Sequence, residues 1–345
     1  MTKKDIREAT DEEIKDFFKK NNIASYRMSQ IKEWLWKKGV SSFDEMTSIS
    51  KENRALLKDF FEIKSMKINH KLVSKDGSIK YLFKLHDNQL IESVLIPSKQ
   101  RITACISSQV GCSLDCKFCA TGSIKLSRNL YCYEMFDQIF YLIKESKKEF
   151  GRSITNIVFM GMGEPLLNYK NLMRSIKIIT EKNGLNISPK RITVSTSGIV
   201  KMIKKLADDN VKFNLAISLH STKDRARSEL MPINKSNDLN KLKNSIKYFY
   251  EKTSIRVTYE YILFNNLNDD LESAKSLAKF CKITPCKINL IEYNPIEDFD
   301  FKKSSKESTI KFINFLEEKN IIVTLRRSKG SDINAACGQL ANKLI

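Results

Sequence analysis

Three cysteines stand close together in the stretch Gly111-Cys112-Ser113-Leu114-Asp115-Cys116-Lys117-Phe118-Cys119-Ala120-Thr121-Gly122, directly after an apolar segment. Their spacing, Cys-x₃-Cys-x₂-Cys, suits a [4Fe–4S] cube held by three thiolates, which leaves one iron without a protein ligand. An open iron can bind a substrate, as the open position of a catalytic zinc does. Phe118 lies between the last two cysteines, where its ring could shield such a cluster from water.

A structural zinc site is the main alternative for this loop. Such a site needs four ligands, and neither a histidine nor a second Cys-x₂-Cys pair stands nearby in the sequence to complete it. Cys132 follows at the start of an expected helix and makes a poor fourth ligand. We therefore expect Cys112, Cys116 and Cys119 to hold an iron–sulfur cluster with one open corner.

Around this loop, apolar strands alternate with helical segments, a pattern that indicates an α/β fold with a parallel sheet. Strands are expected at 102–106, 154–160, 191–195, 213–219, 255–264, 287–293 and 321–325, and helices at 133–147, 172–182, 239–250, 271–280 and 306–319. An open, partial βα barrel is favoured over a doubly wound sheet. Its active face would lie at the carboxyl ends of the strands.

The chain before the barrel divides into two parts. Residues 1–65 carry apolar side chains at helical spacing in three segments, which predicts a small, basic, helical accessory domain that binds nucleic acid. Residues 66–100 contain short strands at 81–83 and 90–96, which predicts a β-rich extension. Residues 101–345 form the expected barrel with a C-terminal loop that carries Cys337.

The charge of the chain points to a polyanionic partner. Among 345 residues, 60 Lys and Arg face 40 Asp and Glu, and the net charge is +20. A merely lysine-rich composition would bring matching acids, so nucleic acid or an acidic membrane surface is expected. We see neither an amphipathic anchor nor a lipidation motif, which favours nucleic acid, with binding that weakens as salt rises. The charged N-terminus and the lack of long apolar runs predict a cytoplasmic protein without membrane contact.

Further motifs accompany the cysteine loop: Cys105-Ile106-Ser107-Ser108-Gln109-Val110-Gly111-Cys112, Gly161-Met162-Gly163-Glu164-Pro165, Ser218-Leu219-His220, Leu230-Met231-Pro232-Ile233-Asn234 and Ala335-Ala336-Cys337-Gly338-Gln339-Leu340. Together, and in this order, they resemble the RlmN/Cfr family of radical S-adenosylmethionine (SAM) RNA adenine methyltransferases. Pro165 stands where Cfr proteins carry Ala, which places the sequence nearer to RlmN. Asn334 stands where an Asp is usual.

The resemblance implies a reaction and its substrates. RlmN-like enzymes methylate C2 of one adenosine in the peptidyl-transferase region of 23S rRNA, and many also act on an adenosine beside the anticodon of tRNA. Cfr-like enzymes methylate C8 of the same ribosomal adenosine, which is the alternative. Two SAM molecules are used per turnover, and an electron-donor protein reduces the [4Fe–4S] cluster. A monomer suffices for this chemistry.

The resemblance also implies residue roles. Cys112, Cys116 and Cys119 would hold the cluster, and SAM would bind its open iron. The SAM contacts would be Gly163, Glu164, Ser195, Ser218, Leu219, His220 and Asn294. Cys337 would be methylated first and then carry the methyl carbon to adenine; Cys105 would release the product by forming a disulfide with Cys337, and Glu92 would accept a proton. Cys132, Cys281 and Cys286 match no family role, so we expect them to be structural.

Two other classes of protein stay open on the sequence. One is a non-catalytic iron–sulfur module that binds RNA through its basic surface. The other is a radical SAM enzyme that acts on a small molecule or peptide, with the charge incidental. Formation of 5′-deoxyadenosine would separate the first from a methyltransferase, and the salt dependence of RNA binding would separate the second.

Overall fold

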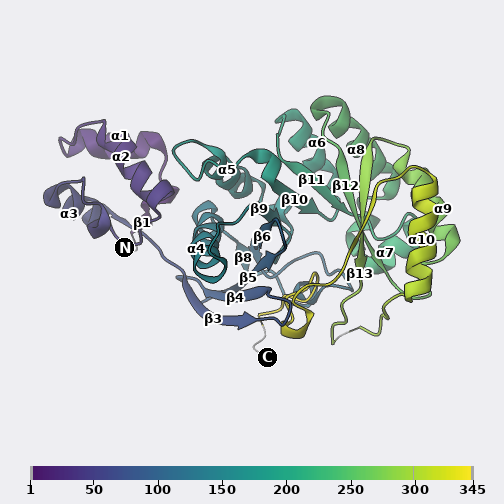
Figure 1. The fold of residues 1–345 in the computed structure, drawn as a ribbon. Coiled ribbons are helices and arrows are strands. Elements are labelled where there is room, and N and C mark those ends of the chain that lie inside the picture. Colours follow the sequence, from purple (N-terminus) through teal and green to yellow (C-terminus); the bar gives the residue numbers. More distant parts are fainter. Residues whose placement is uncertain (1–2, 298, 343–345) are drawn as a thin grey trace.

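The computed structural model describes residues 3–297 and 299–342, and a ten-stranded sheet forms the body of this described part (Figure 1). The strand order is β14-β13-β12-β11-β10-β9-β6-β5-β4-β3. The strands are β3 (Lys67–Val73), β4 (Ile79–Lys84), β5 (Leu90–Pro97), β6 (Ile102–Cys105), β9 (Asn156–Phe159), β10 (Ile192–Thr196), β11 (Asn214–Ser218), β12 (Val257–Leu263), β13 (Cys286–Glu292) and β14 (Val323–Arg326).

The sheet has a parallel part and an antiparallel part. From β6 through β9 to β14 every neighbouring pair is parallel, whereas β3, β4, β5 and β6 form an antiparallel series. β14 and β3 stand at the two ends of the strand order, so the sheet does not close on itself. The open βα barrel expected from the sequence is therefore confirmed, and the β-rich segment before it extends the same sheet.

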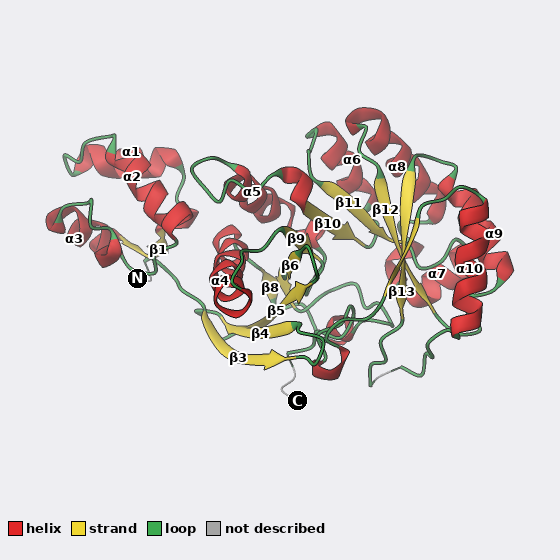
Figure 2. Ribbon diagram, in the orientation of Figure 1, coloured by secondary structure: helices red, strands yellow, loops and turns green. Residues whose placement is uncertain are grey.

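Helices follow the parallel strands and lie along their outer side (Figure 2). They are α4 (Cys132–Phe150), α5 (Tyr169–Thr180), α6 (Val200–Asp208), α7 (Asp224–Leu230), α8 (Leu239–Thr253), α9 (Leu271–Cys281) and α10 (Lys306–Glu318). In α8 the buried residues Leu239, Leu242, Ile246 and Phe249 follow helical spacing, which gives the helix one apolar face for the sheet. β3, α6 and α7 are elements that the sequence analysis did not predict.

The strands of the parallel part are covered on both faces. All seven residues of β12 are buried, as expected for a central strand between the barrel interior and the outer helices. The polar side chains of such strands must find partners inside the protein. The Asn289 amide in β13, for example, donates to Glu260 in β12 at 2.7 Å.

The N-terminal residues form a small helical unit beside the barrel, as the sequence predicted (Figure 1). It contains α1 (Asp11–Lys20), α2 (Arg27–Glu33), α3 (Lys51–Phe60), and a short parallel pair of β1 (Lys4–Asp5) and β2 (Phe61–Glu62). Trp36, just after α2, meets the ring of Phe136 in α4 edge-on at 5.1 Å. The predicted boundaries at residues 65 and 100 stay a prediction.

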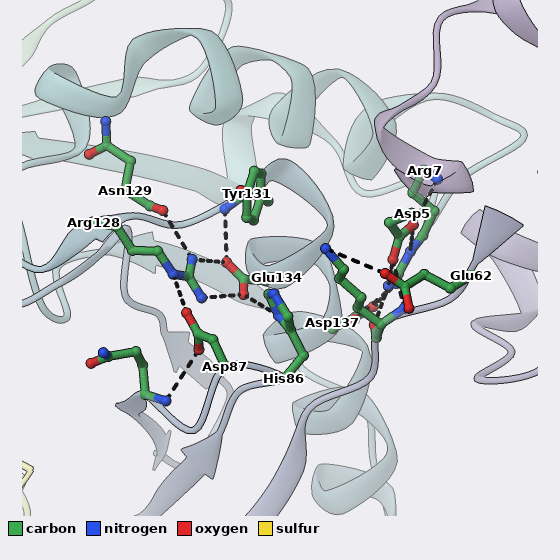
Figure 3. Close-up of polar contacts among 12 residues, drawn as sticks. Asp5, Arg7, Glu62, His86, Asp87, Arg128, Asn129, Tyr131, Glu134 and Asp137 are labelled. Atoms are coloured by element: carbon green, nitrogen blue, oxygen red, sulfur yellow. Dashed lines mark hydrogen bonds and ion pairs between the residues drawn. The ribbon is translucent and has the colours of Figure 1, made fainter. Parts of the chain in front are cut away.

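A buried arginine fastens this N-terminal unit to the barrel. Arg7 pairs with Asp5 at 2.9 Å and with Asp137 of α4 at 2.9 Å, as Figure 3 shows. The guanidinium also lies 4.3 Å from the centroid of the Tyr133 ring. Since both carboxylates compensate the buried positive charge, this contact can hold the two parts together.

None of the helices within the described residues is long and apolar enough to cross a membrane.

Candidate active site

A cavity of about 300 Å³ lies at the carboxyl ends of the parallel strands. Nearly all the site residues predicted from the sequence line it: Cys105, Cys112, Cys116, Cys119, Gly163, Glu164, Ser195, Ser218, His220, Asn294 and Cys337. Leu219 and Glu92 are not among the lining residues. The fold thus brings together side chains from strands that are far apart in sequence, as expected at this face of a βα barrel.

The cysteine triad of Cys112, Cys116 and Cys119 lines one side of the cavity. Burial raises the pKa of Cys116 well above its usual value, and the charges of Cys119 and Cys112 raise it further. Three thiols that oppose one another's ionisation call for a cationic group among them. In the described residues no three His, Cys, Asp or Glu side chains are arranged around a single metal ion. The donor set and its sulfur chemistry fit an iron–sulfur cluster.

Phe118 is buried beside the triad, as expected for a shielding ring. Its ring meets His220 edge-on at 4.5 Å. The His220 Nδ1 accepts a hydrogen bond from the backbone N–H of Ile262 at 3.0 Å. Burial lowers the pKa of His220 to about 3, and the charge of Arg227 lowers it further. His220 is therefore neutral at pH 7, and its Nε2 carries the hydrogen.

Gly163 and Glu164 follow β9 and line the cavity. Gly163 has φ +91°, and a Cβ there would lie 2.4 Å from the Cβ of Gln109, so only glycine fits. The Glu164 carboxylate accepts hydrogen bonds from the backbone N–H and the hydroxyl of Ser197 at 2.8 and 2.9 Å. Burial raises the pKa of Glu164, and the hydrogen bonds from Ser197 oppose this shift. The carboxylate keeps free lone pairs that could accept from an ammonium group.

Cys105 and Cys337 face the same cavity from elements far apart in sequence. Cys105 ends β6 and is buried, whereas Cys337 is exposed to the cavity. Burial raises the pKa of Cys105 to about 12, and Cys337 contributes to that shift by its charge. The dense surroundings of Cys337 likewise raise its pKa to about 12. Both side chains line the same cavity, as an exchange between the two sulfurs requires.

The C-terminal segment, residues 330–342, holds Cys337 against the triad loop. The backbone N–H of Ala120 donates to the carbonyl of Gly338 at 2.7 Å, and the Thr121 hydroxyl donates to the carbonyl of Leu340 at 2.6 Å. Asn294 donates from its amide to the Cys337 carbonyl at 3.1 Å. Gly338 has φ +86°, and a Cβ there would lie 2.8 Å from the Phe118 carbonyl oxygen. The glycine after Cys337 therefore permits the close approach of the two loops.

Glu92 lies behind this segment instead of facing the cavity. It is 1% exposed, although a lone glutamate in a strand usually faces solvent. One carboxylate oxygen pairs with Lys80 of β4 at 3.1 Å, and the other accepts from the backbone N–H groups of Ala341 and Asn342 at 2.9 and 3.2 Å. Lys80 also donates to the Asn334 carbonyl at 3.2 Å. In this structure Glu92 and Lys80 anchor the C-terminal segment.

Sequence reasoning missed several residues around the cavity. Ser197 supports Glu164, and nothing in the sequence distinguishes it from Ser195. Arg326, Arg327 and Lys329 line the cavity and are exposed. Their clustering directly after the last predicted strand would have identified them as a basic rim. Such a rim suits the phosphates of a nucleic acid.

Family models and a solved structure show which class of protein has this fold and site. The Radical SAM superfamily matches residues 106–278, and the ribosomal RNA large subunit methyltransferase N-terminal domain matches residues 4–63. The crystal structure of a radical SAM methyltransferase from Sphaerobacter thermophilus superposes with a TM-score of 0.92 and 37% identity, covering 99% of this chain and 100% of that one. Fold and site define a radical SAM enzyme, whose cofactors are a [4Fe–4S] cluster and SAM.

Similar curated proteins narrow the class. A protein of Christiangramia forsetii, described as a probable dual-specificity RNA methyltransferase RlmN, is 53% identical over 99% of this chain and 97% of its own. A protein of Staphylococcus saprophyticus with the same description is 42% identical over 96% of this chain and 91% of its own. The chain belongs to the RlmN family of radical SAM RNA methyltransferases. A non-catalytic module and an enzyme for small molecules are therefore not favoured.

Proposed function

We propose that this enzyme forms 2-methyladenosine in the peptidyl-transferase region of 23S rRNA and beside the anticodon of tRNA. The observation that carries the proposal is one cavity that gathers the cysteine triad, Glu164 and the thiols of Cys105 and Cys337. The relatives described as dual-specificity RNA methyltransferases support the two kinds of RNA. Their RlmN descriptions favour C2 over the Cfr-like C8 product.

The position of the target carbon explains why such a site is needed. Adenine C2 lies between two ring nitrogens and is electron-poor, so it cannot attack the SAM methyl group as a nucleophile. When bound, the cluster and SAM supply a one-electron cleavage that yields a 5′-deoxyadenosyl radical. The chain positions the groups: the triad would hold the cluster, and Gly163, Glu164, Ser195, Ser218, Leu219, His220 and Asn294 would form the SAM site. Leu219 would contribute there through its backbone, since its side chain is buried.

The two thiols of the cavity divide the transfer into steps. The Cys337 sulfur would accept a methyl group from one SAM, and a second SAM would supply the chemistry that removes one hydrogen atom from that methyl group. The same carbon, still attached to the Cys337 sulfur, would then bond to adenine C2. Enzyme and RNA are then joined through Cys337. The Cys105 thiolate would attack the Cys337 sulfur, so that an S–S bond forms as the bond between that sulfur and the methyl carbon breaks. The released carbon would take up a proton to become the methyl group of the product, and the one electron left over would leave through the one-electron chemistry that the cluster supplies.

Glu92 is the proposed acceptor of the C2 proton, and its contacts set a condition for that role. Its carboxylate is occupied by Lys80 and by two backbone N–H groups of the C-terminal segment. For Glu92 to reach the adenine, part of the segment after Cys337 must shift. The role would therefore be coupled to the arrival of RNA in the cavity.

The remaining partners follow from this chemistry. The cluster would need an electron-donor protein, and an enzyme that acts on rRNA and tRNA would work in the cytoplasm. The basic rim of Arg326, Arg327 and Lys329 would contact RNA phosphates, and the N-terminal unit would contribute further contacts with RNA. A monomer contains every residue that the proposal uses.

Mass spectrometry of digested rRNA and tRNA tests the proposal. Cells that lack this protein should lose 2-methyladenosine from both RNAs, and the wild-type gene should restore it. A Cys337→Ala variant should restore none, because the methyl carrier is absent. Loss of 8-methyladenosine with 2-methyladenosine unchanged would indicate the Cfr-like product instead, and a change in only one RNA would limit the proposal to that substrate.

A further inference from the structure

Arg7 and Arg227 are both almost fully buried, at 3% and 0% exposure, but their partners differ. The charge of Arg7 is matched by two carboxylates (Figure 3). Arg227 donates to the carbonyls of Ser197, Ser218 and Leu219 at 2.6, 3.1 and 3.1 Å, and to the Asn234 amide oxygen at 2.7 Å. All of these acceptors are neutral. Within residues 3–297 and 299–342, no carboxylate lies within ion-pair distance of Arg227.

A buried charge without a counter-charge is expensive. Burial lowers the pKa of Arg227 to about 10, which still leaves the guanidinium positive at pH 7. The four hydrogen bonds use four of the five N–H groups of the guanidinium, but they do not neutralise its charge. An amide or an uncharged side chain could have made similar hydrogen bonds at lower cost. The Asp224 carboxylate also favours the charged form of Arg227, but it accepts from Asn234 at 3.0 Å and makes no ion pair with the guanidinium. The charge of Arg227 is therefore available to a second anionic group on the side of the cavity.

The cysteine triad is the group in the right place. α7, which carries Arg227, ends at Leu230, and the Leu230 carbonyl accepts from the backbone N–H of Lys117 within the triad loop at 3.0 Å. Ser197 and Ser218, whose carbonyls accept hydrogen bonds from Arg227, both line the cavity. Arg227 thus lies directly behind the site of the cluster.

We propose that Arg227 is the internal counter-charge of the iron–sulfur cluster and raises its reduction potential. The inference rests on a cluster bound by the triad. Reduction adds one electron from a low-potential one-electron donor, and the negative charge of the cluster with its three thiolates grows by one. A fixed positive charge in a medium of low dielectric constant stabilises the more negative form. Arg227 touches neither SAM nor RNA in this assignment and acts through the cluster alone.

The proposal is tested by a potentiometric titration of the full-length, anaerobically reconstituted enzyme, followed by electron paramagnetic resonance without SAM or RNA. In Arg227→Gln the potential should become more negative. The ratio of reduced to oxidised cluster at the wild-type midpoint should fall about tenfold, the order expected for a unit charge at this range. Arg227→Lys keeps the charge and should stay near the wild type. A purely structural role would make both variants behave alike.

Two further variants make the result decisive. Arg225→Gln makes the same change on the same helix at a side chain that is 92% exposed, where water screens the charge; its potential should equal that of the wild type. The double variant Asp224→Asn with Asn234→Asp keeps the net charge and the arginine, but moves a carboxylate to the atom that now accepts from Arg227 at 2.7 Å. It should shift the potential as Arg227→Gln does.

Two outcomes are distinguishable. If Arg227→Gln and the double variant bind four irons and keep the wild-type potential, Arg227 is not the counter-charge, while the proposed function stands. If the wild type itself binds no iron–sulfur cluster, the proposed function fails at its first step.

Discussion

Single residues at the ends of β11 and β12 show how the backbone decides what a side chain can do. His220 has φ +52°, a left-handed conformation, and from there its Nδ1 reaches the N–H of Ile262. Its carbonyl accepts from the Asn268 amide at 2.7 Å. The contact with Ile262 fixes the imidazole and the contact with Asn268 fixes the backbone of His220, before any ligand binds. Such a ring can present one N–H to the cavity but cannot act as an acid near pH 7.

The sequence identified this histidine by its motif but could not assign its protonation, because that depends on burial and on Arg227, which comes from an unpredicted helix. The same limit applies to Glu92. Its motif position was readable, but its ion pair with Lys80 and its contacts with Ala341 and Asn342 join parts of the chain that no local pattern connects. Cysteine spacing, in contrast, is local, and so the triad could be predicted.

The lowered pKa of His220 predicts how the stability of the protein depends on pH. The unfolded chain binds a proton at His220 near pH 6.5, whereas the folded protein binds it only near pH 3. The unfolded state therefore gains protons first, and stability is lost as pH falls below about 6.5. At pH 5 the loss from this residue is about 2 kcal/mol.

A His220→Asn variant should remove this part of the pH dependence, since asparagine tolerates the left-handed backbone and can accept from Ile262. Urea unfolding at pH 7.5 and pH 5 should show a smaller loss of free energy of unfolding in the variant than in the wild type, by about 2 kcal/mol. His70→Asn, at an exposed residue of β3, controls for the substitution itself. Equal losses in the wild type and His220→Asn would contradict a neutral buried His220.

At the scale of elements, the turn between β3 and β4 has a role that its sequence does not announce. Asp332 of the C-terminal segment accepts from the Ser74 hydroxyl at 2.6 Å and from the Lys75 N–H at 3.0 Å. In return, Asp76 accepts from the Gly330 N–H at 2.7 Å. The turn grips the segment that carries Cys337. The predicted "β-rich extension" therefore helps to position a thiol of the active site.

Elements with a strong periodic pattern were predictable, and those without one were not. β12 is a continuous buried strand, and α8 carries buried apolar residues at helical spacing. Both were predicted close to their observed bounds. β3 is exposed along most of its length, so it lacks the apolar pattern of a strand. α7 has seven residues, too few for a helical period to stand out. Tertiary contacts stabilise such elements more than their own sequence does.

An Asp332→Ala variant tests the grip of the turn on the C-terminal segment. The loss of both acceptor bonds should loosen the segment, and alkylation of Cys337 by iodoacetamide should become several-fold faster in the cluster-free protein. The measurement is the rate of label uptake at Cys337 by peptide mass spectrometry. Asp87→Ala is the matched control. Asp87 lies in the turn between β4 and β5, and its carboxylate pairs with Arg128 and not with the C-terminal segment. Equal rates of Cys337 alkylation in the two variants would show that Asp332 does not hold the C-terminal segment in place.

For the whole molecule, the question is how the N-terminal unit stays in place beside the barrel. The surface ion pairs of that unit, such as Lys32 with Asp11, are exposed and contribute little. Arg7 is different because its charge, Asp5 and the ring of Tyr133 are buried together, and Asp137 is only 14% exposed. The ion pair between Arg7 and Asp137 joins the N-terminal unit to α4 of the barrel, so it stabilises the junction between the two parts. We infer that Arg7 sets the orientation of the N-terminal unit relative to the barrel.

An Arg7→Met variant should therefore destabilise the junction more than any exposed pair can. It leaves Asp5 and Asp137 buried without their cation, which should lower the free energy of unfolding by about 3–5 kcal/mol. Limited proteolysis should also cut sooner in the connection at residues 63–66, between β2 and β3. Lys32→Met, which breaks the exposed pair with Asp11, should change stability by less than about 1 kcal/mol. If urea unfolding gave equal values for the two variants, the N-terminal unit would have to be held by its apolar contacts, such as that of Trp36 with Phe136, and not by Arg7.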